Sequence, residues 1–122
     1  SYVLMDGRYR EVAPEFQVSL NVLATVISRG PDRLLFDVGR KGLADDMGLP
    51  AIVGRPELEV DNISEEHTRA IVKSNCDLKV GDVVRLVPRH CCCTVNLHNY
   101  LHVVRDGRVE DVWPVAARGA LR

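Results

Sequence analysis

The sequence has little that would connect its 122 residues to a membrane, a nucleic acid or an export route. Basic residues number 16 and acidic residues 17, so the formal net charge of −1 gives no electrostatic reason to bind nucleic acid or an anionic membrane. No apolar run approaches the roughly 20 residues of a membrane-spanning helix. Because no basic segment followed by an apolar one stands at the start, we expect no export signal. These absences indicate a small domain with neither a membrane nor a nucleic acid as partner.

The sequence also lacks the widely spaced cysteines of a secreted disulfide scaffold. Its four cysteines are Cys76 and the consecutive Cys91, Cys92 and Cys93. The Cα atoms of neighbouring residues lie about 3.8 Å apart, below the roughly 4.4–6.8 Å that a normal disulfide prefers. We therefore expect all four thiols to be reduced and the protein to be cytoplasmic.

Turn residues divide the chain into short β-branched segments, and no long stripe of period 3.6 is present. The predicted strands lie at residues 16–29, 33–39, 67–73, 82–88 and 101–115. The last of these contains Asp106-Gly107, the favoured pair for a two-residue hairpin turn. Residues 16–29 have a helix as the alternative, and residues 41–54 are expected to form a loop. The pattern predicts an all-β fold, a small barrel or sandwich of short, mostly antiparallel strands, in a single domain spanning residues 1–122.

The stretch "PRHCCCTVNLH" contains the strongest candidate for a chemical site. If the chain stays extended beyond Pro88, alternate side chains share a face, so His90 and Cys92 point together and Cys91 and Cys93 point the other way. Imidazole nitrogen and thiolate sulfur are both good zinc ligands. Two protein ligands are too few for a closed structural site and suit a site whose other positions take water or substrate.

Packing is the alternative interpretation of this cysteine cluster, because reduced cysteine is among the most buried residue types. Under the metal hypothesis as well, Cys91 and Cys93 need only be small core residues. His98 and His102 lie four positions apart. They either supplement the site, if the intervening loop folds back, or are partly exposed histidines, which is the interpretation we favour.

Three further residues have open roles. His67 follows Glu65 and Glu66 and either pairs with a carboxylate for acid–base chemistry or lies at a solvated strand end. Lys41 either receives an anion or, as we favour, is a solvated loop lysine. Trp113 is expected to anchor the core.

Four stretches of the chain together resemble a known family. They are "DVGRKGLADDMGLP", "SEEH", "GDVVRLVPRHCCCTVNLH" and "VEDVWPVAARGAL", in this order. They resemble the C-terminal β domain of the D-threonine aldolase and D-serine dehydratase family, and the resemblance runs over nearly the whole chain. Its most specific part is the combination of P-x-H-x-x-x-T-V-N-L-H with the ending W-P-V-A-A-R-G.

The resemblance implies a longer parent enzyme. Full-length members place an alanine-racemase-like (β/α)8 barrel before this domain, and that barrel carries the lysine that forms a Schiff base with pyridoxal phosphate (PLP). The catalytic lysine and the PLP-binding residues are therefore expected outside this chain. The chain begins with Ser1, and residues 1–5 read as a strand, as in a domain taken from a longer protein. We expect the β domain alone to be inactive, and its partners to be the barrel and a second subunit of a homodimer.

The resemblance also implies metal ligands and a reaction. By position, the family's two ligands for a divalent metal fall on His90 and Cys92. This pair favours zinc, with manganese or magnesium as alternatives. The cysteine resembles the dehydratases, whereas the surrounding chain is more similar to the aldolases. The expected reaction is retro-aldol cleavage of a D-3-hydroxy amino acid, such as D-threonine, to glycine and an aldehyde. The alternatives are dehydration of D-serine or D-threo-3-hydroxyaspartate, and a non-catalytic dimerisation module.

Overall fold

The computed structural model describes residues 4–120. The strands in this range are β1 (Val22–Arg29), β2 (Arg33–Phe36), β3 (Ala51–Ile52), β4 (Leu58–Ile63), β5 (Thr68–Val72), β6 (Val83–Val87), β7 (Tyr100–Arg105) and β8 (Arg108–Pro114). The helices are α1 (Tyr9–Val12) and α2 (Cys91–Asn96). Neither helix of this part of the chain has the length and apolar character that crossing a membrane requires.

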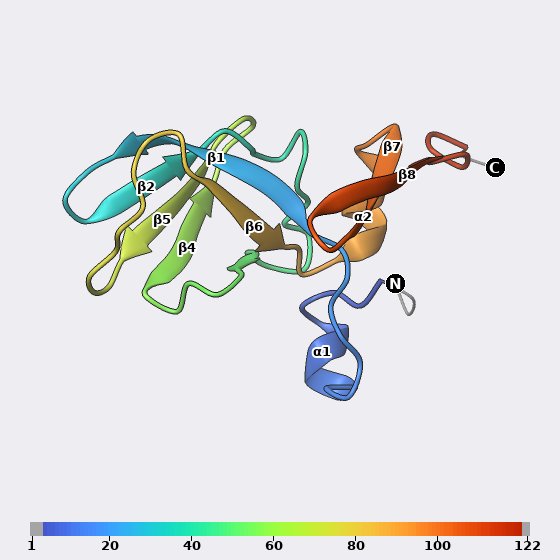
Figure 1. The fold of residues 1–122 in the computed structure, drawn as a ribbon, viewed down its shortest axis with the longest axis horizontal. Coiled ribbons are helices and arrows are strands. Elements are labelled where there is room, and N and C mark those ends of the chain that lie inside the picture. The colour runs from blue at the N-terminus through green and yellow to red at the C-terminus, as the bar shows by residue number, and fades with distance from the viewer. Residues whose placement is uncertain (1–3, 121–122) are drawn as a thin grey trace.

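Six of the strands form one antiparallel sheet in the order β3-β6-β1-β2-β5-β4. The edge strands β3 and β4 contact each other, so the sheet is nearly closed into a barrel (Figure 1). The small all-β barrel of antiparallel strands predicted from the sequence is therefore confirmed. The two helices and the hairpin of β7 and β8 lie at one end of this barrel (Figure 1).

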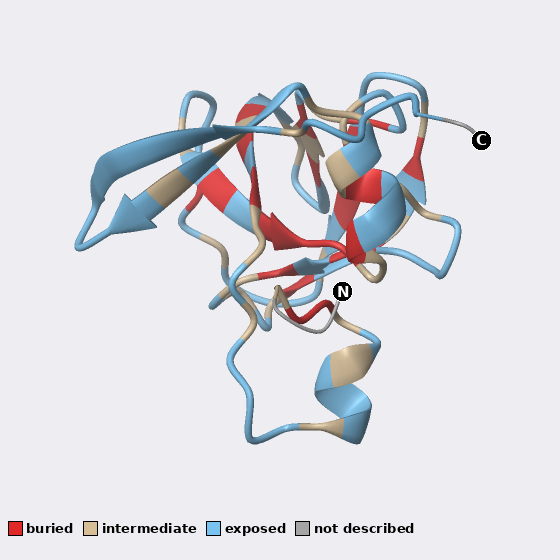
Figure 2. Ribbon diagram, turned by 90° about the vertical axis from the view of Figure 1, so that its right-hand side faces the viewer, coloured by how far each residue is buried: buried red, intermediate tan, exposed pale blue. Residues whose placement is uncertain are grey.

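Alternate residues of the strands fill the barrel interior, as the period of an extended chain requires. In β1, Val22, Ala24 and Val26 are buried, whereas the residues between them are less so. Leu34 and Phe36 of β2 have no exposed surface. Figure 2 shows that the buried residues gather in the barrel strands and in the segments beside α2.

The first predicted strand starts later than expected. β1 begins at Val22, and the helix considered for residues 16–29 is absent. The backbone N–H groups of Ser19 and Leu20 instead donate to the carbonyl of Leu4, at 2.9 and 3.3 Å. The strand expected at residues 1–5 lies partly outside the described residues, and its described part, residues 4–5, is not a strand.

Two barrel strands were not predicted from the sequence. The short β3 lies inside residues 41–54, which were expected to form a loop throughout. Strand β4 was missed because "LEVDNI" mixes polar residues with apolar ones. A register shift between Val60 and Asn62 restores the alternation, so that Ile63 again points inward. The polar residue at the shift, Asp61, accepts three hydrogen bonds from Arg69 of β5, Nε–Oδ1 at 2.9 Å, Nε–Oδ2 at 3.1 Å and Nη2–Oδ2 at 2.7 Å. Cross-strand pairing thus stabilises a segment whose composition alone does not indicate a strand.

The hairpin predicted at residues 101–115 is confirmed. Asp106 and Gly107 both have positive φ, 49° and 75°, as a type I′ turn requires. The hairpin forms a separate two-stranded sheet, and nearly all of it is exposed (Figure 2). Trp113 is 53% exposed, and its indole N–H donates to Asp111 at 2.8 Å. The expectation that Trp113 anchors the core is therefore wrong, because its strand does not belong to the barrel.

Candidate metal centre

The chain turns into a helix where the sequence predicts a continued strand. β6 ends at Val87, and α2 begins at Cys91 after one last extended residue, His90, with φ −140° and ψ 115°. Pro88 lies at the turning point, and it has no N–H with which to continue a strand ladder. The expected extended run through the three cysteines is therefore wrong, and strand alternation is not what places Cys92 near His90.

The first turn of α2 gives the three cysteines different environments. Cys91 is 1% exposed, and burial raises the pKa of its thiol to about 12, so its predicted packing role is confirmed. Cys92 and Cys93 are both exposed, so the packing role predicted for Cys93 is wrong. The residue before a helix and the third residue of the helix face each other, and this relation brings Cys93 beside His90.

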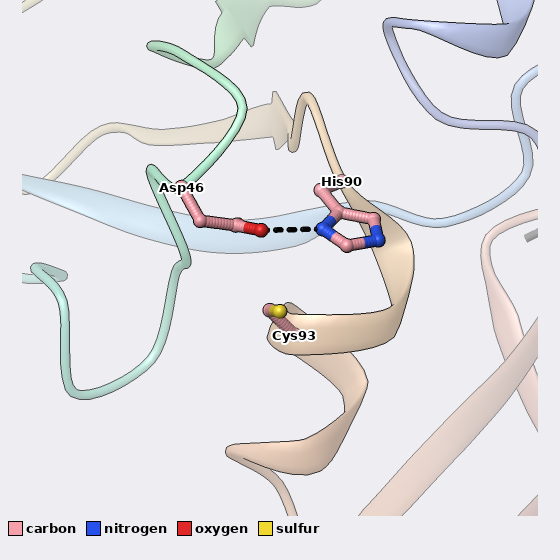
Figure 3. Close-up of side chains that lie close together, drawn as sticks. All are labelled: Asp46, His90 and Cys93. Carbon is pink, nitrogen blue, oxygen red and sulfur yellow. Dashed lines mark hydrogen bonds and ion pairs between the residues drawn. The ribbon is translucent and has the colours of Figure 1, made fainter.

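Asp46 is the partner of His90, and sequence reasoning missed it. The Asp46 Oδ2 atom lies 2.6 Å from the His90 Nδ1 atom (Figure 3). This hydrogen bond lowers the pKa of the Asp46 carboxyl and raises the pKa of the His90 imidazole. A carboxylate at Nδ1 holds the proton on that nitrogen and leaves the Nε2 lone pair for a metal. The available signal was the pair Asp45-Asp46 inside a glycine-containing loop of a family-like stretch.

The two exposed thiols interact with different members of the site. The Cys93 thiol hydrogen-bonds to Asp46, and this bond raises the pKa of Cys93. Cys92 hydrogen-bonds to His90 and is a further cause of the raised pKa of that imidazole. Because a cysteine binds metal as the thiolate, the hydrogen bond that the Cys93 thiol donates to Asp46 must be released before Cys93 can bind a metal. Cys92, the ligand predicted from the sequence, does not belong to the clustered group of ligand atoms that the described residues form around His90, which contains Cys93 and Asp46.

The residues at this end of α2 fit a divalent metal. Ligand atoms of Asp46, His90 and Cys93 all lie within 4.8 Å of one another. In a tetrahedral zinc site, bonds of about 2.0–2.3 Å place ligand atoms roughly 3.3–3.8 Å apart. His90 and Cys93 are therefore close enough to share an ion, and Asp46, bonded to the His90 Nδ1 atom, orients the imidazole. Asp46, Cys92 and Cys93 are exposed, and a metal held here would be accessible to a substrate.

The loop that carries Asp46 is fastened to α2 and to the barrel. The Ala44 N–H donates to the Thr94 hydroxyl at 3.3 Å, and that hydroxyl donates to the carbonyl of His90 at 3.0 Å. The His98 Nε2 atom lies 2.7 Å from the carbonyl oxygen of Gly42, to which its N–H donates. Gly39 starts the loop, and a Cβ at this position would lie 2.4 Å from the Ser64 carbonyl oxygen.

The other sequence candidates lie elsewhere. Within residues 4–120, His67, His98 and His102 belong to no group of clustered ligand atoms. His98 is half-buried and holds the loop, whereas His67 and His102 are exposed. Lys41 is also exposed and pairs with Glu66, Nζ–Oε1 at 2.5 Å, so the interpretation as a surface loop lysine agrees with the structure.

A second group of possible ligands, Glu57, Cys76 and Asp77, lies at the far end of the barrel strands. The Arg55 guanidinium pairs with both carboxylates, at 3.4 Å and 2.6 Å. A positive charge already occupies the position that a metal ion would take. We therefore assign no metal to this group.

Comparison with known proteins agrees with the resemblance. Residues 19–104 match the family model described as "Putative serine dehydratase domain". The chain belongs to this family. The D-threonine aldolase of an Arthrobacter species is 44% identical over 100% of the chain and 34% of its own length. The 3-hydroxy-D-aspartate aldolase of Paracoccus denitrificans is 38% identical over 98% of the chain and 33% of its own length.

The fold of this domain is also that of a solved relative. The D-threonine aldolase from Filomicrobium marinum superimposes with a TM-score of 0.92 at 32% identity, over 100% of the domain and 36% of that enzyme. The domain thus spans about a third of the length of these aldolases. An uncharacterized protein of Mycobacterium tuberculosis differs in this respect, because its 34% identity extends over 84% of the domain and 85% of its own length.

Proposed function

We propose that this domain holds the divalent metal of a PLP-dependent lyase that cleaves D-3-hydroxy amino acids, such as D-threonine, to glycine and an aldehyde. The observation that supports it most is the group of imidazole, thiol and carboxylate that His90, Cys93 and Asp46 form at the start of α2, in a chain 44% identical to a D-threonine aldolase. The parent enzyme would supply the lysine and the PLP site from residues outside this chain. Its compartment would be a reducing one such as the cytoplasm, because the thiols must stay reduced to bind metal.

We assign His90 and Cys92 as the metal ligands. Asp46 keeps the Nδ1 proton of His90 in place and so presents Nε2 to the metal. Cys92 lies on the exposed side of the same turn and touches the imidazole. With sulfur and nitrogen ligands, zinc is the favoured ion, and manganese or magnesium would rely more on the Asp46 carboxylate.

The chemistry that PLP and a divalent metal supply determines which roles remain for the residues of this chain. PLP supplies an electron sink for the substrate carbanion, and a divalent metal stabilises negative charge on a hydroxyl oxygen of the substrate. His90 and Cys92 leave the remaining metal positions open, and their exposed location lets a substrate bound by a preceding barrel reach them. Residues 1–122 would then form one domain that completes an active site in a homodimer.

The test is zinc binding by the protein at its full encoded length. We expect His90→Ala and Cys92→Ala to abolish stoichiometric binding, and Cys93→Ala to retain it. Tight binding that survives both His90→Ala and Cys92→Ala would contradict the ligand assignment. The reaction is tested by incubating the enzyme with D-threonine and with D-serine. Acetaldehyde and glycine support aldol cleavage, whereas 2-oxo acids and ammonia as the main products identify the alternative, a dehydratase.

A non-catalytic β module is the second candidate function, and one observation favours it. The mycobacterial relative covers 85% of its own length with this domain, so the fold occurs in a chain of nearly this size. Such a module would bind a partner or a second copy through exposed apolar residues of the β7–β8 hairpin. Sedimentation of the 122-residue chain distinguishes the two. A concentration-dependent dimer supports the module, and a monomer at high concentration counts against it.

A further inference from the structure

A buried carboxylate far away in the sequence holds the start of α2. Asp6 is 1% exposed, and its two oxygens accept backbone hydrogen bonds from opposite sides. Oδ1 accepts from the Tyr9 N–H and Oδ2 from the Cys91 N–H, each at 2.9 Å. Burial alone would raise the pKa of Asp6, but these hydrogen bonds outweigh it and lower the pKa. Asp6 is therefore a carboxylate inside the protein whose oxygens both have backbone partners.

Helix α2 needs an external partner at its start. The side chain of the residue before it, His90, makes no capping hydrogen bond to the backbone N–H groups of the first turn. The histidine ring points instead to Asp46. A helix of six residues is too short to be stable without tertiary contacts. Asp6 supplies to the Cys91 N–H the acceptor that a Ser, Thr, Asp or Asn before the helix would normally supply.

Other contacts join the same two segments. We call residues 4–11 the N-terminal segment. It includes most of α1 and lies at the same end of the barrel as α2 (Figure 1). The Gly7 N–H donates to the Pro88 carbonyl at 3.0 Å. The Arg89 guanidinium pairs with Glu11 at 2.5 Å. The N-terminal segment thus holds the residues on both sides of His90, namely Pro88, Arg89 and Cys91, and Asp6 makes the buried one of these contacts.

We propose that Asp6 is a positioning residue for the metal site, one that fixes the backbone from which His90 and Cys92 project. The inference rests on the metal binding proposed above. The backbone N–H of Cys91 lies between the two ligands in the chain, so its direction sets the orientation of both side chains. Asparagine cannot replace Asp6 fully, because two N–H donors face two oxygens and an amide offers only one. The carboxylate thus has a role that simple packing would not require.

The experiment measures metal geometry separately from stability, in the protein at its full encoded length. The variants are Asp6→Asn and Asp6→Glu, and the latter keeps the charge but moves the oxygens by one methylene. The matched control is Asp82→Asn, since the Asp82 carboxylate also accepts a backbone N–H, from Lys79 at 2.9 Å, at a turn outside the site. The readouts are the zinc Kd, the thiolate-to-cobalt absorption band of the Co²⁺ form, and hydrogen exchange of the Cys91 amide.

We expect both Asp6 variants to raise the zinc Kd by about tenfold or more, as loss of a group that orients a metal ligand usually does. We also expect them to change the cobalt band and to speed exchange of the Cys91 amide. Asp82→Asn should leave all three unchanged. If the Asp6 variants bind zinc as the wild type does while His90→Ala and Cys92→Ala abolish binding, the positioning role is refuted and the metal site stands. If the wild type binds zinc without need of His90 or Cys92, the proposed function fails and the positioning role fails with it.

If Asp6→Asn does not fold, the positioning role is tested by zinc binding of Asp6→Glu and by hydrogen exchange of the Cys91 amide in the wild type. A Cys91 amide that exchanges as fast as the N–H groups of exposed loops would refute the role, because an N–H bonded to a buried carboxylate opens only with the surrounding structure. An amide protected like those of the barrel strands, together with a weakened zinc site in Asp6→Glu, would support it.

Discussion

Replacing Asp46 by asparagine gives a direct test of the metal centre. The carboxylate contacts His90 at 2.6 Å, and the two side chains are 40% and 23% exposed. Loss of a partner that orients a metal-binding histidine usually costs about 10–100-fold in metal affinity. We expect the lower end, about tenfold or about 1.4 kcal/mol, because the pair is partly exposed and an amide oxygen can still accept the Nδ1 proton.

The pH dependence of this effect has a definite sign. Asp46 raises the pKa of His90 above its usual value of 6.5, so a proton competes with the metal until the pH exceeds the raised pKa. In Asp46→Asn the His90 pKa falls back, and the midpoint of zinc binding moves to lower pH. The loss of affinity should therefore be largest above the raised pKa and should shrink as the pH falls.

The assay is a zinc competition titration against a chromophoric chelator at several pH values. The matched control is Asp45→Asn, because Asp45 pairs with Arg40, Nη2–Oδ2 at 2.9 Å, and not with His90. A zinc affinity in Asp46→Asn equal to that of the wild type, or an equal loss in Asp45→Asn, would refute the orienting role. A binding midpoint that moves to higher pH would refute the assigned sign.

Three further predictions concern stability and reactivity. Phe36→Ala should lower the free energy of unfolding by about 3–5 kcal/mol in urea denaturation, because Phe36 is fully buried, whereas exposed Trp113 replaced by alanine should change it by less than about 1 kcal/mol. In the native protein, iodoacetamide should modify exposed Cys92 but not Cys91, because burial raises the pKa of the Cys91 thiol to about 12. Bound zinc should protect Cys92, and mass spectrometry of the labelled peptides checks both expectations. The stability contributed by Asp6, whose pKa lies below 3.8 in the folded state, should be fully present above that pH and be lost as the pH falls through the lowered value, so Asp6→Asn should show a flatter acid-unfolding curve.

The barrel was predictable because local signals agree with tertiary structure over most of it. The turn pair Asp106-Gly107 has the backbone that its residues favour, and β2, β5 and β6 lie within the predicted segments. Strand β4 escaped detection because its alternation resumes only after the register shift near Asp61. Trp113 was misplaced because size and hydrophobicity do not say whether a strand joins the barrel or forms a separate hairpin.

The metal centre was less predictable, since long-range contacts determine it. Nothing in the residues from 88 to 96 favours a helix: His90 is a poor capping residue, and cysteine, threonine and valine have modest helix propensity. The acceptor for the first turn comes from Asp6, 85 positions away. The partner of His90 comes from Asp46, 44 positions away. Local propensity therefore predicted that the strand continues through the cysteines. The pair His90 and Cys92 was chosen by strand alternation, which the chain does not follow here.

The same separation has a consequence for how substitutions act. The barrel core fixes only the end of β6. The assigned ligands lie beyond it, His90 just before a short helix and Cys92 in its first turn, where Asp6 holds the backbone and the loop that carries Asp46 faces them. A change in the barrel core, such as Phe36→Ala, acts on the unfolding equilibrium of the whole domain and leaves the metal site intact in molecules that remain folded. A change at Asp6 or Asp46 acts on the orientation of His90 while the barrel still folds. Phe36→Ala should therefore lower the unfolding free energy with little change in metal affinity, Asp46→Asn should lower metal affinity with little change in unfolding free energy, and Asp6→Asn should change both. The contrast between Phe36→Ala and Asp46→Asn is the physical sign that the site is built on the barrel rather than within it.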